Sequence, residues 1–134
     1  MIQRLHNLVI AVALLMTFLS PAYALDRTCA ECGMRVKMDS PFTARIVQGD
    51  TTLYFCDIGD LFVYLRKKNP NNARAEVRDF PTGAWVEARK ASYVHEENKF
   101  RTPMGWGVAA FGDAAKASQS GAAMDFDSMA KKLK

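Results

Sequence analysis

The stretch TTLYFCDIGDLFVYLRKKNP, residues 51–70, encodes a strand, a helix start and a helix end in one run. Its first five residues are mostly β-branched or aromatic, which predicts a strand over 51–55. Asp57 follows as a helix N-cap. The apolar side chains after it recur at the spacing of one helical face: Ile58, Leu61, Phe62 and Leu65. The helix should end at Asn69, because the residue before a proline resists helical geometry.

The rest of the chain contains further β-type and helical runs. Residues 42–47 precede a turn at 48–50, so they should form a hairpin with 51–55. After the helix come four β-type runs, at residues 76–80, 85–88, 92–95 and 106–111. A helix is expected over 113–118, with Gly121 ending it.

This order of elements predicts an α+β fold of two small strand-strand-helix (ββα) units packed together. The first unit spans about residues 29–69 and the second about residues 74–121, followed by a short helical tail at 125–133.

The N-terminus has the pattern of a signal peptide. Arg4 precedes an apolar run at residues 8–19, and Ala22 and Ala24 give the small-x-small pattern of a cleavage site. The run is shorter than the roughly 20 residues that a membrane-spanning helix needs. We therefore expect residues 1–24 to be a signal peptide cleaved after Ala24. Residues 25–134 would then be one exported, periplasmic domain without a stable membrane anchor.

Charge and histidine content exclude some classes of function. The formal net charge is only +4 and the basic residues are scattered, which does not favour a nucleic-acid partner. Of the two histidines, His6 lies in the predicted signal peptide, so His95 would be the only one in the exported domain. A catalytic mechanism that needs two histidines is thereby excluded.

Three cysteines remain after cleavage: Cys29, Cys32 and Cys56. The first two form a Cys-x-x-Cys pair, which is compatible with a thiol-disulfide oxidoreductase. Together with His95, the three thiols also give the four ligands of a structural zinc site, as in a zinc-stabilised interaction domain. A third alternative is a site for a soft metal ion.

Two methionines favour the soft metal. Met34 follows Gly33 directly after the cysteine pair, and Met104 lies between a proline and a glycine, a setting typical of a loop. Thioether is a poor zinc ligand, whereas thiolate and thioether together select Cu(I). The simpler alternative is that both methionines fill the core.

Four segments of the sequence resemble the NosL family, the copper-binding accessory proteins associated with nitrous oxide reductase maturation. In chain order the segments are ECGMRV, LYFCDIGDLFVYL, VRDFPTGAWVEARKASYVH and RTPMGWGVAAF. The resemblance covers about residues 29–115 and continues weakly through FDSMAKKL.

The resemblance implies a monomer of two ββα units that delivers Cu(I) to a copper-receiving periplasmic protein or its assembly machinery. It assigns the Cys-Gly-Met ligands to Cys32 and Met34, and the Pro-Met-Gly ligand to Met104. Cys29 or His95 would fill a remaining position. Two features differ from the family pattern: many members are lipoproteins, and Cys29 and Cys56 enlarge the thiol set here.

Overall fold

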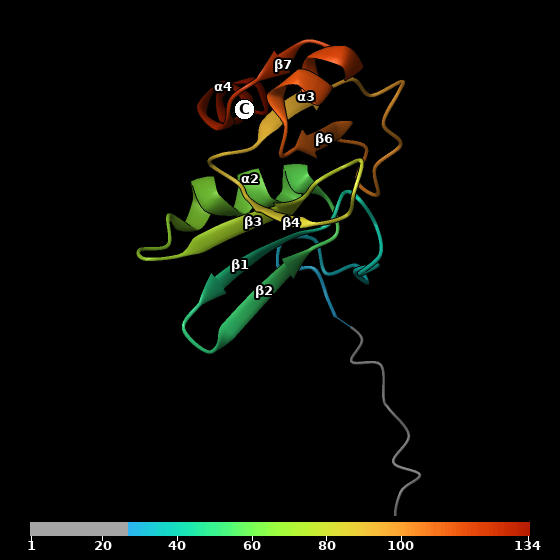
Figure 1. The fold of residues 1–134 in the computed structure, drawn as a ribbon. Helices are drawn as coiled ribbons and strands as arrows, with labels where there is room; N and C mark the ends of the chain where they lie inside the picture. Colours follow the sequence, from blue (N-terminus) through green and yellow to red (C-terminus); the bar gives the residue numbers. More distant parts are fainter. Residues whose placement is uncertain (1–26) are drawn as a thin grey trace, which may run out of the picture.

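The computed structural model describes residues 27–134, so the expected signal peptide lies outside the described residues (Figure 1). Four antiparallel strands form the first sheet, in the order β2-β1-β3-β4. Their bounds are Ala44–Gln48 for β1, Thr51–Phe55 for β2, Arg74–Arg78 for β3 and Trp85–Glu87 for β4. The predicted hairpin is therefore confirmed.

Helix α2, Ile58–Lys68, begins and ends where the sequence predicts. Asp57 is the N-cap, and its side chain accepts a hydrogen bond from the backbone N–H of Gly59. Asn69 ends the helix in the left-handed conformation, with φ of 39°. An asparagine tolerates this conformation better than most residues, and the proline that follows prevents the helix from continuing.

The second sheet has three antiparallel strands in the order β6-β5-β7, with two short helices. Its elements are β5 (Ser92–His95), β6 (Val108–Phe111), α3 (Ala114–Ser120), β7 (Ala123–Met124) and α4 (Phe126–Lys132). The two-residue strand β7 was not predicted, because it is too short to show an alternating pattern.

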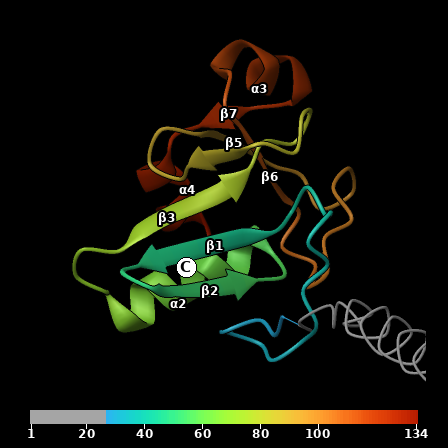
Figure 2. The same ribbon diagram turned by 60° about the horizontal axis from the view of Figure 1, so that its bottom comes forward.

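The α+β class is confirmed, and the order strand-strand-helix occurs twice, as β1-β2-α2 and as β5-β6-α3. Strands β3 and β4 were predicted to belong to the second unit, at about residues 74–121, but they extend the first sheet instead. Figure 2 shows β3 beside β1. The end of β3 is joined to the second sheet, because Phe80 donates a backbone hydrogen bond of 2.8 Å to the Ala110 carbonyl of β6. Helix α2 contacts strands of both sheets (Figure 1).

One hydrophobic core cluster extends across both sheets and α2. Phe55, Leu61, Val77, Tyr93 and Val108 all belong to it and are fully buried. The first turn of α2 is thereby held between the two sheets, which fixes the segments that flank it. Within residues 27–134, no helix combines the length and the apolar composition needed to cross a membrane.

Replacing Leu61 by alanine should destabilise the fold strongly. The side chain is fully buried in α2, so its truncation should lower the free energy of unfolding by about 2–5 kcal/mol, measured by urea denaturation. Lys68→Ala, at the exposed end of the same helix, is the matched control and should change it by less than about 0.5 kcal/mol. Equal effects of the two substitutions would contradict this placement of α2.

Candidate metal centre

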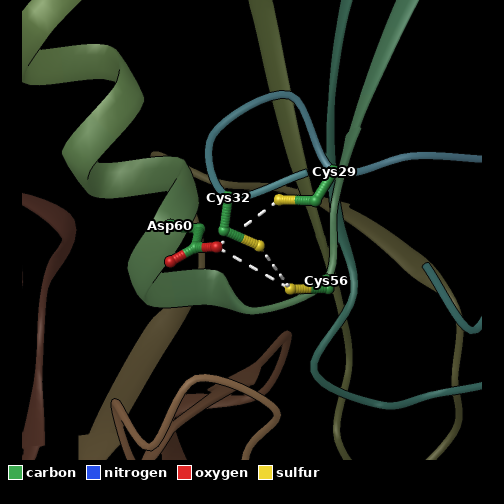
Figure 3. Close-up of side chains that lie close together, drawn as sticks. All are labelled: Cys29, Cys32, Cys56 and Asp60. Atoms are coloured by element: carbon green, nitrogen blue, oxygen red, sulfur yellow. Dashed lines mark hydrogen bonds between the residues drawn. The ribbon is translucent and has the colours of Figure 1, made fainter. Parts of the chain in front are cut away.

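Three thiols and one carboxylate converge beside the first turn of α2 (Figure 3). The Sγ atoms of Cys29, Cys32 and Cys56 and a carboxylate oxygen of Asp60 all lie within 4.8 Å of one another. Cys29, Cys56 and Asp60 are buried, whereas Cys32 is partly exposed. All three cysteines are free thiols in the structure. We call these four residues the thiol cluster.

A tight loop presents Cys29 and Cys32. The backbone N–H of Cys29 donates to the Met34 carbonyl (2.8 Å), and that of Gly33 donates to the Cys29 carbonyl (3.0 Å). Gly33 has φ of 78°, a conformation that other residues rarely adopt, so glycine is needed to close the loop. Ala30 donates to the Tyr54 carbonyl of β2 (2.9 Å), which attaches the loop beside Cys56.

Asp60 and Cys56 come from the junction of β2 and α2. The Oδ2 atom of Asp60 accepts hydrogen bonds from the thiols of Cys29 (3.4 Å) and Cys56 (3.7 Å). The Sγ atoms of Cys32 and Cys56 are 3.4 Å apart. One metal ion could therefore contact several of these atoms after small shifts.

The second carboxylate oxygen of Asp60 is occupied by Trp106. The indole Nε1 donates to Oδ1 at 2.9 Å, which orients Oδ2 toward the thiols. Trp106 lies directly against the helix, because a Cβ atom at Gly59 would be 2.0 Å from its Cγ. Glycine at position 59 is therefore what allows the segment that carries Met104 to approach α2.

Asp57 holds the same segment at a second point. Its Oδ2 accepts a hydrogen bond of 2.9 Å from the backbone N–H of Met104. Burial raises the pKa of the Asp57 carboxyl, although hydrogen bonds from Thr102, Gly59 and Met104 oppose that shift. The helix cap predicted from the sequence thus also positions the Met104 loop.

The two candidate thioethers lie at the surface of the protein. Met34 is 47% exposed and Met104 is 42% exposed, and they are the large hydrophobic side chains that residues 27–134 leave exposed. Met34, Cys56 and the two residues before Met104, Thr102 and Pro103, line one surface depression. Core filling, the simpler alternative for these methionines, is therefore excluded.

His95 lies apart from the thiol cluster. It ends β5, where it pairs with Val108 of β6. Its Nε2 is 3.6 Å from a carboxylate oxygen of Glu97, and it is not one of the four residues whose ligand atoms converge in the described part of the chain. Four zinc ligands that include this histidine are thus not brought together.

Sequence analysis did not name Asp60 as a candidate ligand. The available signal was its spacing, because Asp60 follows Cys56 by four residues and faces the same side of the helix start. Its burial and its bond to Trp106 depend on a segment more than forty residues away, which no local pattern reveals.

Burial raises the pKa of two thiols of the cluster, those of Cys32 and Cys56. It raises the pKa of Cys32 to about 11. Burial, and then the contact with Cys32, also raise the pKa of Cys56. A cysteine that catalyses disulfide exchange needs the opposite shift, since the thiolate is the nucleophile. Cys32 and Cys56 are therefore poorly suited as nucleophiles of disulfide exchange, and these thiols would release protons on binding a metal ion.

Alkylation of Cys32 should be slow at neutral pH and accelerate with pH. With a pKa of about 11, about one thiol in a thousand is ionised at pH 8, and this fraction rises about tenfold per pH unit. The measurement is the iodoacetamide rate at Cys32 in metal-free, reduced protein, by mass spectrometry, with N-acetylcysteine as the reference thiol. A rate that reaches a plateau below pH 8 would contradict the raised pKa.

Comparisons with known proteins agree with the fold and with the resemblance in the sequence. The NosL family model matches residues 22–132. The crystal structure of the copper chaperone NosL from Shewanella denitrificans is similar in fold, with a TM-score of 0.63 and 21% sequence identity. The match covers 75% of this chain and 87% of that chain. A search of curated proteins found no match. Because the family model spans most of the sequence, this chain belongs to the NosL family.

Proposed function

We propose that this chain is a periplasmic Cu(I) chaperone, not an enzyme, which delivers copper for the maturation of nitrous oxide reductase or a similar copper enzyme. Membership of the NosL family supports this, as does the likeness in fold to a protein described as a copper chaperone. The observation that carries the proposal is the convergence of three thiols next to an exposed thioether.

The proposed ligands are sulfur atoms of two kinds. Cys32 supplies a thiolate whose charge neutralises Cu(I), and Cys29 and Cys56 lie close enough to share the ion. Met34 and Met104 add neutral, weaker donors at the surface. This combination of soft donors favours Cu(I) over harder cations. His95 is left out of the proposed set, because it lies beside Glu97.

The arrangement suits the transfer of copper between proteins. The buried thiols of Cys29 and Cys56 shield one side of the ion from water, while the exposed thioethers are accessible to an incoming ligand. A recipient can bind the ion before the chaperone releases its last sulfur, so free copper need not form. A fully enclosed four-ligand site would lack this opening.

Zinc is the second candidate metal for this site, because three cysteine thiolates and one carboxylate also make an acceptable zinc ligand set. In that case the chain would be a zinc-stabilised interaction domain. Metal analysis of protein purified without oxygen distinguishes the two. One tightly held zinc ion, whose removal by a chelator unfolds the protein, would favour the zinc domain.

Cu(I) binding should depend on both kinds of sulfur. Cys32→Ser combined with Met34→Leu removes the charged donor and one thioether. We expect Cu(I) affinity to fall by about 100-fold, or about 2.8 kcal/mol, in anaerobic competition with bathocuproine disulfonate. Met104→Leu tests the second loop alone and should weaken binding by about tenfold.

The matched control is Met124→Leu, which removes a thioether from β7 in the second sheet. Its Cu(I) affinity should equal that of the unaltered protein. If the double variant also binds with unaltered affinity, the proposed ligands are wrong.

A further inference from the structure

The depression beside the thiol cluster has a positively charged edge. Arg35, Lys37 and Arg101 line it together with Met34 and Cys56, and we call the three cations the basic rim. None of the described residues that line the depression is an aspartate or glutamate. The opening next to the proposed copper ligands therefore carries charge of one sign.

Several cations elsewhere in the described part of the chain form ion pairs with carboxylates. Arg45 and Arg74 pair with the buried Glu76, and Lys67 pairs with Glu31. By contrast, Lys37 and Arg101 are exposed and form no ion pair within residues 27–134. These two rim residues are thus available to a partner.

The lining of the depression also contains apolar side chains. Met34 is in the depression itself, and Met104 directly follows Pro103, which also lines it. Phe42 adds further apolar surface to the lining. An apolar centre with charges around it is the usual composition of a specific protein interface. A concave surface of this kind fits a protruding segment better than a flat lipid surface.

We propose that the basic rim docks an acidic face of the copper-receiving protein, whose acceptor sulfur atoms are flanked by aspartates or glutamates. This inference rests on the proposed function. Opposite charges accelerate the encounter and orient the acceptor toward the thioethers, and salt screens the effect. The expected partner is therefore recognised by negative charge around a soft copper ligand.

The transfer itself exchanges ligands without oxidation. An acceptor thiolate forms a bond to Cu(I) as the bond to a sulfur of this chain breaks, and copper remains monovalent. The acceptor thiol loses its proton on binding, and the thiolate freed in this chain takes one up.

Three synthetic peptides test the charge preference. Each contains one Cys-x-x-Cys pair, flanked by four aspartates, four serines or four lysines. With the Cu(I)-loaded protein at 10 mM salt, transfer to the aspartate peptide should be at least about tenfold faster than to the lysine peptide. The difference should largely vanish at 1 M salt, where the Debye length falls from roughly 30 to 3 Å. Equal rates for the three peptides at low salt would overturn the docking proposal.

Charge-reversal variants test whether the rim residues cause the preference for the aspartate peptide. Lys37→Glu with Arg101→Glu should reverse the order of the aspartate and lysine peptides and leave Cu(I) affinity within about twofold. Lys116→Glu with Lys132→Glu, on α3 and α4, changes net charge equally away from the depression and should preserve the order. If the rim variant instead loses Cu(I) affinity as much as it loses transfer rate, the rim balances thiolate charge and the docking proposal fails.

Two further outcomes separate this inference from its alternatives. Co-sedimentation with phosphatidylglycerol vesicles that depends on Lys37 and Arg101 would assign the rim to a membrane surface and overturn the proposal. Failure of the unaltered protein to bind Cu(I) at all would overturn the proposed function, whereas unselective transfer overturns only the docking.

Discussion

The carboxylates of Asp57 and Asp60, at the start of α2, each bind the loop that carries Met104. Asp57 accepts a hydrogen bond from the backbone N–H of Met104, and Asp60 accepts one from the indole N–H of Trp106. Asp60 also accepts hydrogen bonds from two thiols, Cys29 and Cys56. The start of α2 therefore fixes two segments that are distant from it in the sequence, the loop of Cys29 and the loop of Met104. The core on both sides of α2 keeps that turn in place. This turn therefore sets the position of the thiols relative to the loop that carries Met104.

The proposed copper ligands differ in how far their side chains are buried. Thiolates are costly to bury without a counter-ion, and burial accordingly raises the pKa of Cys32 and Cys56. A monovalent cation relieves that cost, since it replaces the protons and balances the charge. The thioethers of Met34 and Met104 carry no charge, so they can lie at the surface with no such requirement. In the proposed function, the thiolates hold the copper ion and the thioethers leave the site open to a recipient.

Local patterns in the sequence were sufficient for much of the fold. The apolar spacing after Asp57 and the break at Asn69 predicted α2, and the turn around Gly49 predicted the first hairpin. These features depend on residues that are neighbours in the chain. The pairing of β3 with β1 and the two-residue β7 depend on distant partners, so no local signal shows them.

The site was predictable only in part for the same reason. Sequence analysis could name Cys29, Cys32, Cys56 and the two methionines as candidates, because their chemistry is visible in the residue types. It could not determine which of them meet. The structure joins all three thiols, places His95 elsewhere and adds Asp60, whose role depends on Trp106 across the fold.

X-ray absorption at the copper edge of the Cu(I)-loaded protein tests the central claim most directly. If sulfur ligands converge on the ion from separated loops, the first coordination shell of copper should contain sulfur alone. It also predicts fewer sulfur neighbours when Cys56 is replaced by serine. An imidazole nitrogen in that shell, or a shell unchanged by the replacement, would contradict the account.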